Sequence, residues 1–404
     1  MTETPFQNKT IVLGVTGSIA AYKAAEIASR LRQMGALVEV ILTQSACHFI
    51  SPLTFASVTA RKAYVDQDLW GNEGHVVHIG LGRAADLLLI APVSATTLAK
   101  LAHGIGDNLL TVTALASHCP MILAPAMDAG MYAHPATAAN VEILRARGAV
   151  FVGPAAGHLA SGLVGVGRMA EPAEILDTAR LALAQSGPLR GKHIVITAGG
   201  TQEPIDPVRV ITNRSSGKQG YAVARAALDA GASVTLITAP TALVPPLGCR
   251  VVPVKTAAEM QAAVLAETAQ ADALVMAAAV ADFRPAQASS EKIKKEKTIP
   301  QVHLERTADI LADVAARRAQ SGYPRRVVGF AAESQDLLQN AQSKLTRKQL
   351  DLIVANDITA PDAGFEVETN RVTLLFADGR TETLPLQQKA EVARRIVDAL
   401  VEWS

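Results

Sequence analysis

The chain has 404 residues, 49% of them hydrophobic, and its 38 basic and 37 acidic side chains give a net charge of +1. This length predicts two or three domains and is ample for sizeable hydrophobic cores. A nearly neutral chain with 4% aromatic residues has no global field to attract a polyanion, so we expect no nucleic-acid partner. The three cysteines lie far apart without CxxC spacing, which indicates neither a disulfide framework nor a cysteine zinc site.

The apolar runs AADLLLIAP (84–92) and DALVMAAAVA (272–281) are too short to cross a bilayer. The first residues, MTETPFQNKT, lack the charged region and apolar region of a secretory signal. We therefore expect a protein with no membrane segment and a cytoplasmic location.

The amino-terminal half opens with a predicted βαβ unit. KTIVLGV reads as a strand, AAYKAAEIASRLRQ as a helix and VEVIL as the returning strand. Gly14 and Gly17 have GxxG spacing, and no acidic residue ends the second strand, so the dinucleotide fingerprint is absent. This pattern disfavours NAD.

Hydroxyl groups follow the ends of the strands in this half. They are Ser18 after the first strand, Thr43 after the second, and Ser94, Thr96 and Thr97 after the run at 84–92. Because the carboxyl ends of parallel strands meet at one edge, these hydroxyls and nearby helix amides suit one phosphate. Alternatively, Ser18 and Ser94 are only helix caps.

HVVH (75–78) places two histidines at i, i+3, a spacing at which two metal ligands would share one helix face. No third ligand lies near them in the sequence. We favour no metal at this position.

The carboxyl-terminal half repeats the pattern of the first. KHIVITAGG reads as a buried strand, YAVARAALDAGA as a helix and DALVMAAAVA as a further strand. Two such halves predict an α/β protein with two doubly wound, Rossmann-like domains. Helical periodicity is lost at Ser186, Gly187 and Pro188, which predicts a linker there and domains at 1–188 and 189–404.

The loop IDPVRVITNRSSGKQGY (205–221) separates the first strand and helix of the second domain. It carries Asp206, Arg209, Asn213 and Lys218 at a strand's carboxyl end, where open α/β sheets bind ligands. We expect this loop to hold an anion. It is not a Walker A motif, because SSGKQG ends in GKQ rather than GK[ST].

The tail departs from the doubly wound pattern. NRVTLLFADGRTETLPL alternates around Asp378 and Gly379, which predicts an antiparallel β-hairpin. QQKAEVARRIVDALVEW then predicts a closing helix.

Charged residues of the second domain suggest a nucleotide site. Asp282 follows the strand at 272–281, and Lys292 lies in the basic run EKIKKEKT, so we interpret them as a base-or-ribose contact and a phosphate contact. A solvated loop is the alternative for the basic run. Lys344 and Lys348 share one helix face, which suits a triphosphate, or else forms an ordinary solvated face.

Four segments of the first half resemble a known family. GSIAAYK, TQSACHFI, APVSATTLAK and GIGDNLL are similar to the FMN-binding framework of the homo-oligomeric flavin-containing cysteine decarboxylases. The resemblance implies an FMN site that includes Gly17, Ser18, Thr43, Ser94 and Thr96. It also matches His78 to the family's essential histidine beside the flavin, and leaves His75 as an ordinary surface residue.

Two positions depart from that family. Ser161 stands where a flap cysteine usually supplies a proton, and Asp128 stands where an asparagine usually holds the substrate. A serine hydroxyl is far less acidic than a thiol. An ionised Asp128 would repel a substrate carboxylate, whereas a buried, protonated Asp128 would replace the missing acid. We predict catalytic roles for both residues.

The second half resembles the ligase half of bacterial bifunctional phosphopantothenoylcysteine decarboxylase/phosphopantothenate-cysteine ligase. The resemblance implies a CTP site formed by Met276, Ala277, Ala278, Asp282, Lys292, Ala308, Asp309, Ile310, Leu311, Phe330, Lys344 and Lys348. It implies that Asn213 binds an acyl-cytidylate. It also implies Mg²⁺ held mainly by the phosphates.

Together these resemblances imply an enzyme of coenzyme A synthesis. It would ligate 4'-phosphopantothenate to cysteine with CTP, and then decarboxylate 4'-phosphopantothenoylcysteine to 4'-phosphopantetheine with FMN. The implied assembly is a homo-oligomer with amino-terminal trimers and ligase dimers. The alternatives are an active ligase whose FMN domain is impaired or purely structural, and a non-catalytic flavin-binding regulatory subunit.

Overall fold

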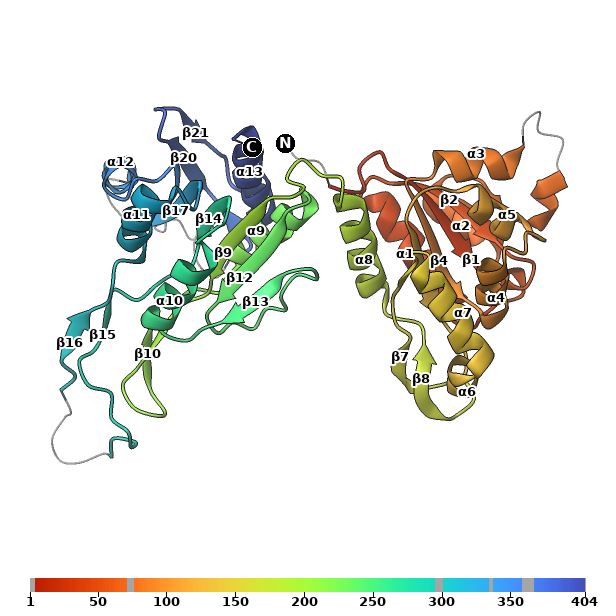
Figure 1. Cartoon of the computed structure of the whole chain (residues 1–404), viewed down its shortest axis with the longest axis horizontal. Coiled ribbons are helices and arrows are strands. Elements are labelled where there is room, and N and C mark those ends of the chain that lie inside the picture. Colours follow the sequence, from red (N-terminus) through yellow and green to blue (C-terminus); the bar gives the residue numbers. More distant parts are fainter. Residues whose placement is uncertain (1–3, 71–75, 295–300, 334–336, 358–366, 404) are drawn as a thin grey trace. The chain divides into compact units, whose positions relative to one another are not determined.

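The computed structural model describes residues 4–70, 76–294, 301–333, 337–357 and 367–403. Two compact units divide between Ala184 and Gln185, and each is described by itself (Figure 1). In this part of the chain, no helix combines the length and the apolar character that a membrane crossing requires.

The first unit contains a six-stranded parallel sheet in the order β3-β2-β1-β4-β5-β6. Its strands are β1 (Thr10–Val15), β2 (Leu37–Leu42), β3 (Ala63–Tyr64), β4 (Leu87–Val93), β5 (Met121–Pro125) and β6 (Val150–Phe151). Ile11 of β1 lies beside Val38 on one side and Leu87 on the other. The strand order therefore reverses between β1 and β4, the point at which doubly wound sheets bind ligands.

Helices cover both faces of this sheet. They are α1 (Ala21–Gln33), α2 (Pro52–Thr59), α3 (Val77–Ala84), α4 (Ala95–His103), α5 (Leu109–Ala116), α6 (Ala129–Ala133), α7 (Pro135–Ala146) and α8 (Pro172–Ala184). Ile11 and Leu13 pack in one core with α1 and α8, whereas Val12 packs in the other with α4 and α5. The alternation of β1 side chains between two cores is the packing of a doubly wound sheet.

A small antiparallel hairpin, β7 (Ala155–His158) and β8 (Val164–Arg168), lies outside the sheet and beside α6 (Figure 1). We call residues 155–168 the flap hairpin. The sequence reading identified this segment as a flap but did not predict its strands.

The second unit contains an eight-stranded sheet in the order β13-β12-β9-β14-β17-β18-β20-β21. Its strands are β9 (His193–Ala198), β12 (Ser233–Thr238), β13 (Arg250–Pro253), β14 (Ala273–Met276), β17 (Arg326–Glu333), β18 (Leu352–Asp357), β20 (Val372–Phe376) and β21 (Thr381–Thr383). The first six are parallel in the same order as in the first unit, and β20 and β21 are antiparallel. The predicted doubly wound folds are thus confirmed.

The predicted hairpin and closing helix are also confirmed. β20 and β21 pair around Gly379, whose φ of 92° suits glycine, and α13 (Lys389–Glu402) packs on α9 (Lys218–Asp229). The remaining helices are α10 (Ala257–Glu267), α11 (Ile310–Ser321) and α12 (Leu337–Arg347).

Three two-stranded ribbons of this unit were not predicted from the sequence. They are β10 (Gln202–Pro204) with β11 (Val210–Thr212), β15 (Phe283–Pro285) with β16 (Leu304–Arg306), and β19 (Thr369–Asn370) with β22 (Gln387–Gln388). The β15–β16 ribbon projects from the eight-stranded sheet (Figure 1). These strands have two or three residues each, too few to show an alternating pattern.

Candidate functional sites

The loops that follow β1 and β4 are joined at the switch point of the first sheet. The Thr16 hydroxyl donates to the Pro92 carbonyl at 2.9 Å and accepts a hydrogen bond from the Ser94 amide at 2.9 Å. Thr16 is 1% exposed, so this buried bond fixes the two loops where a ligand is expected.

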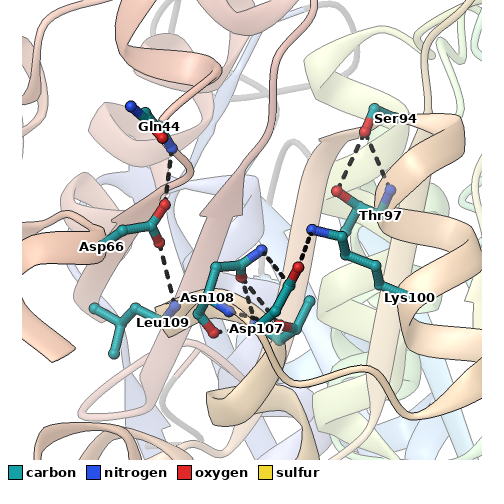
Figure 2. Close-up of polar contacts among 9 residues, drawn as sticks. Gln44, Asp66, Ser94, Thr97, Lys100, Asp107, Asn108 and Leu109 are labelled. Atoms are coloured by element: carbon teal, nitrogen blue, oxygen red, sulfur yellow. Dashed lines mark hydrogen bonds and ion pairs between the residues drawn. The ribbon is translucent and has the colours of Figure 1, made fainter.

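The hydroxyl side chains that were predicted to bind a phosphate differ in their surroundings. Ser94 caps α4 by accepting from the Thr97 amide at 3.3 Å, and it contacts the Thr97 hydroxyl at 3.2 Å (Figure 2). Thr43 accepts from the Ala46 amide at 3.3 Å, whereas Thr96 is exposed on α4. The neighbour of Ser94 is thus Thr97 rather than Thr96.

Ser18 lies in the turn before α1 and not at the helix start, because α1 begins at Ala21. Its hydroxyl accepts from the Ala20 amide at 3.3 Å. A Cβ added at Gly17 would lie 2.6 Å from Ser45 Cβ, so the loops after β1 and β2 approach closely only because residue 17 is glycine.

A pocket of about 550 Å³ opens beside Ser18. It extends to Asp128 and to Ser161, which lies in the flap hairpin. Its volume lies within the range typical of cofactor sites. The Ser18 hydroxyl and the main-chain amides that follow it line one end of the pocket and suit the phosphate of a flavin mononucleotide, whereas Thr43, Ser94, Thr96 and His78 do not line it. The residues present therefore fit FMN.

His78 lies in the first turn of α3 and is half-buried. Within the described residues its Nδ1 atom is buried and has no hydrogen-bond partner. A buried polar atom without a protein partner is uncommon and indicates a ligand or water. His75, the other histidine of the HVVH pattern, lies outside the described residues.

Asp128 and Ser161 meet in the pocket. The Ser161 hydroxyl donates to Asp128 Oδ2 at 2.7 Å, and the Gly130 amide donates to Asp128 Oδ1 at 2.9 Å at the start of α6. The bond from Ser161, and then that from Gly130, lowers the pKa of the Asp128 carboxyl below its ordinary value. Of the two states left open by the sequence, this geometry supports the ionised one.

Glycines of β8 allow the flap hairpin to pack against the segment that carries Asp128. The Met127 amide donates to the Gly167 carbonyl at 3.0 Å. A Cβ at Gly167 would lie 2.2 Å from the Met127 carbonyl oxygen, and one at Gly165 would lie 2.6 Å from Ala129 Cβ. Any larger residue would force the hairpin away from Asp128.

In the second unit, the loops after β9 and β14 are joined at the equivalent switch point. Thr197 accepts from the Ala278 amide at 3.0 Å, and Thr201 accepts from the Ala281 amide at 2.9 Å. Met276 ends β14, so the predicted run 276–278 lies at the carboxyl edge of the sheet.

Asn213 reaches this loop from the segment before α9. Its amide donates to the Val280 carbonyl at 3.1 Å. On the other side of the loop, the Thr307 amide donates to the Asp282 carbonyl at 3.0 Å, and the Asp282 side chain is exposed. Asn213 and Asp282 thus flank the same backbone.

The predicted run 308–311 begins directly after Thr307. Asp309 caps α11 by accepting from the Ala312 amide at 3.2 Å, and it forms an ion pair with Lys348. Burial lowers the pKa of the Lys348 ammonium, while the Asp309 carboxylate beside it favours the charged form. Ile310 is 4% exposed in the core, so only its main chain can meet a ligand.

Lys344 and Phe330 are half-buried, the former on α12 and the latter on β17 beside Val354. Asn356, at the end of β18, is 8% exposed, and within the described chain its Oδ1 has no hydrogen-bond partner. This unpaired oxygen makes Asn356 a further candidate contact.

Lys292 is exposed on a segment that is anchored by Asp206 and Arg209. The Ile293 amide donates to Asp206 Oδ2 at 3.1 Å, and Arg209 Nη2 donates to the Ile293 carbonyl at 2.7 Å. Among the described residues, no hydrogen bond or ion pair joins Lys292 to Asp282 or Lys348.

Asp206 is 3% exposed and charged. Burial alone would raise its pKa, but hydrogen bonds from the Val208, Ile293 and Arg209 amides and from the Arg209 side chain hold the pKa well below its ordinary value. In this loop Arg209 pairs with Asp206, and Lys218 pairs with Glu368. That the loop holds an anion stays a prediction.

Comparisons with known proteins agree with this division of sites. Residues 1–183 match the model of the flavoprotein family, and residues 189–403 match the DNA/pantothenate metabolism flavoprotein C-terminal domain. The coenzyme A biosynthesis bifunctional protein CoaBC of Bacillus subtilis is 44% identical over 98% of this chain and 98% of its own length. The protein of that name from Mycobacterium tuberculosis is 46% identical over 98% and 97%.

The chain belongs to the family of coenzyme A biosynthesis bifunctional proteins. This confirms the resemblance drawn from the sequence, and with it the expectation of a ligase and a decarboxylase in one chain. A solved structure, the C-terminal domain of a coenzyme A biosynthesis bifunctional protein CoaBC, is also similar, with 40% identity, a TM-score of 0.45, and coverage of 54% of this chain and 98% of that one.

Sequence reasoning missed the anchoring role of Asp206 and the ion pair of Asp309 with Lys348. It also missed Asp66, whose carboxylate accepts hydrogen bonds from the Gln44 and Leu109 amides, in two of the segments predicted to bind FMN (Figure 2). The role of Asp206 could have been found from the sequence, because an aspartate in a turn that is followed by Arg209 is typical of an Asx-type loop. The Asp309–Lys348 pair and the bonds of Asp66 join segments that are distant in the sequence, so no local pattern indicates them.

Proposed function

We propose that the second unit joins 4'-phosphopantothenate to cysteine at the expense of CTP, and that the first unit decarboxylates the product with FMN. The observation that carries the ligase assignment is a continuous set of contacts at the carboxyl edge of the second sheet. Asn213 bonds to the loop after β14, that loop bonds to Thr307, and the next turn brings Asp309 to Lys348.

The ligase reaction begins with attack of a carboxylate oxygen of 4'-phosphopantothenate on the α-phosphorus of CTP. A new P–O bond forms, the bond to the β-phosphate breaks, and pyrophosphate leaves with the electron pair. The cysteine amine then attacks the acyl carbon, CMP leaves, and the amine loses a proton to solvent. Two anions meet in the first step, so its barrier falls when cations neutralise the developing charge.

The described residues supply this neutralisation in distinct ways. Lys344 lies on α12. Lys348 follows the end of that helix and pairs with Asp309 at the start of α11, whose first amides also favour anions. In this proposal Mg²⁺ would neutralise charge on the phosphates, Lys292 would add a cation from the anchored segment, and Asn213 would hold the acyl-cytidylate. Met276, Ala277 and Ala278 leave room for a base, because their side chains are small or point into the core.

For the decarboxylase, bound FMN supplies reversible two-electron transfer. In this proposal the flap hairpin covers the substrate and excludes water through the packing of β8 on Met127. His78, which does not line the pocket at the flap hairpin, would act beside the flavin. Ser161 and Asp128 face each other where the family has cysteine and asparagine. In this proposal Ser161 relays a proton from solvent to the product carbon and regains its own proton from that water, while Asp128 fixes the orientation of the hydroxyl.

An alternative is an active ligase whose flavin unit is impaired or only structural. The ionised Asp128 favours it, because an anion in the pocket opposes a substrate carboxylate. Release of carbon dioxide from 4'-phosphopantothenoylcysteine separates the two possibilities.

We further propose domains at 1–188 and 189–404, a cytoplasmic location, and a homo-oligomer with amino-terminal trimers and ligase dimers. The family model boundaries at 183 and 189 support the domain limits. Analytical ultracentrifugation of the full chain tests the assembly, because a monomer would contradict it.

Pyrophosphate release tests the ligase. The full chain should release pyrophosphate from CTP only when 4'-phosphopantothenate is present. Lys292→Ala should slow release about tenfold or more, whereas Lys294→Ala, in the same exposed run, should not. Equal rates for both variants would remove Lys292 from the site.

A further inference from the structure

Asp66 is the first residue of the 3-10 helix η2 (Asp66–Trp70), which follows the edge strand β3. Its half-buried carboxylate accepts two main-chain hydrogen bonds (Figure 2). The Gln44 amide donates to Oδ2 at 3.1 Å, and the Leu109 amide donates to Oδ1 at 3.2 Å. Each carboxylate oxygen is therefore bonded to a different segment of the chain.

Those two segments lie in TQSACHFI and GIGDNLL, two of the motifs that resemble the FMN-binding framework. Gln44 follows Thr43 in the loop after β2, and Leu109 is the first residue of α5. We propose that Asp66 is a positioning residue that fastens these two loops, and that it raises the affinity of the chain for FMN without touching the flavin. This inference rests on the proposed FMN site.

The α5 end of this connection is firmly held. Leu109 and Leu110 are fully buried, and a Cβ at Gly14 would lie 2.5 Å from Leu110 Cδ1, so α5 packs directly on β1. Asn108 caps α5 by accepting from the Thr111 amide at 2.9 Å. Asp66 therefore has a fixed support on one side.

A second link ties the start of α5 to α4. Lys100 of α4 forms an ion pair of 2.8 Å with Asp107, which adjoins the Asn108 cap (Figure 2). Ser94 caps the same helix at its other end. The start of α5 thus connects the loops after β2 and β4, and Asp66 makes the hydrogen bond to the loop after β2.

The Gln44 side of the connection is exposed and depends more on Asp66. The Gln44 side chain is exposed, and the loop continues to Cys47, also exposed. Burial, followed by the negative charge of Asp66, raises the pKa of the Cys47 thiol in this loop. Without Asp66, this loop would lose an anchor next to Thr43 and Ser45.

Asp66→Asn is the main test variant. The amide oxygen can accept one of the two hydrogen bonds, but the NH2 group then faces the other main-chain N–H, donor against donor. Asp68→Asn is a matched control, because it removes the same charge from the same 3-10 helix. Asp68 bonds to the Val65 amide at 2.8 Å and to Lys62 at 2.9 Å, and to neither flavin loop.

The measurement is the Kd for FMN of the full-length apoprotein, from quenching of flavin fluorescence, with the visible flavin spectrum and the thermal midpoint of the apoprotein. We expect Asp66→Asn to raise Kd about tenfold and Asp68→Asn less than about twofold. At saturating FMN, carbon dioxide release and the flavin spectrum of Asp66→Asn should return to those of the wild type.

A wild-type Kd in Asp66→Asn would overturn the inference and leave the FMN site standing. Failure of the wild type itself to bind FMN would overturn both. If Asp66→Asn lowers the thermal midpoint of the apoprotein, Asp66→Glu is the deciding variant. It keeps the negative charge on a longer side chain and should raise the Kd for FMN at least about threefold. An unchanged Kd in a folded Asp66→Glu protein contradicts the proposal.

Discussion

The Ser161 hydroxyl donates a hydrogen bond of 2.7 Å to Asp128 Oδ2, and this bond joins the tip of the flap hairpin to the residue that caps the start of α6. Both residues depart from the pattern of the cysteine decarboxylases. In this chain the Ser161 hydroxyl is the donor and the Asp128 carboxylate is the acceptor of one hydrogen bond. The two residues that differ from the family pattern therefore contact each other.

Asp128→Ala removes the acceptor for both Ser161 and the Gly130 amide. We expect carbon dioxide release from 4'-phosphopantothenoylcysteine to fall about tenfold. Asp128→Asn keeps an oxygen acceptor and should stay within about threefold of the wild type. Leu163→Ala, an exposed change in the same hairpin, is the control. Equal rates in all three variants would show that Asp128 has no special role.

Gly167→Ala tests the packing of the flap hairpin. The added Cβ would meet the Met127 carbonyl oxygen, so the hairpin must move, and we expect tryptic cleavage after Arg168 to become at least about threefold faster. Gly130→Ala is the matched control, because its Cβ would lie 3.4 Å from Asp128 Oδ1, an ordinary contact. Equal cleavage of the two variants would contradict the packing argument.

Asp206→Asn should destabilise the second unit in a pH-dependent manner. The folded-state pKa of Asp206 lies below its unfolded value, so its contribution is fully present above about pH 4 and is lost as pH falls through the folded pKa. The thermal midpoint of the wild type should therefore exceed that of Asp206→Asn at pH 7, and the gap should narrow at acidic pH.

Glu305→Gln, which breaks the exposed pair with Arg284, is the control for this series and should change the midpoint little at any pH. A gap between wild type and Asp206→Asn that is constant from neutral to acidic pH would mean that the Asp206 charge does not stabilise the loop.

Lys348→Ala removes a cation and leaves Asp309 without its ion-pair partner beside the proposed triphosphate. We expect the KM for CTP to rise about 10- to 100-fold, the effect of losing a hydrogen bond to a charged group. Arg347→Ala removes an adjacent, exposed cation and should change KM less than about twofold. Similar KM values for both variants would place the triphosphate elsewhere.

The sequence was sufficient to predict the elements with long periodic patterns. β1, α1 and β2 in the first half, β9, α9 and β14 in the second, and the β20–β21 hairpin follow from apolar runs or from alternating or helical apolar spacing. The short ribbons could not be predicted, because their strands are held by pairing with a distant segment rather than by their own pattern.

The candidate sites were predictable as sets of residues but not as contacts. Residue type and spacing identified Asn213, Asp309 and Lys348, yet the Asp309–Lys348 pair depends on how α11 and α12 pack. Arg209 looked like an anion ligand because sequence shows charge but not partner, and its partner is Asp206. Thr96 and Thr97 differ only in the direction each faces on α4, which packing decides.

Isotope transfer tests the central claim most directly. The full chain is supplied with CTP, cysteine and 4'-phosphopantothenate that carries ¹⁸O in its carboxylate, and the products are analysed by mass spectrometry. Attack of the carboxylate on the α-phosphorus predicts CMP that contains one ¹⁸O atom, formed together with pyrophosphate. Unlabelled CMP, or ¹⁸O found in inorganic phosphate, would contradict the acyl-cytidylate route.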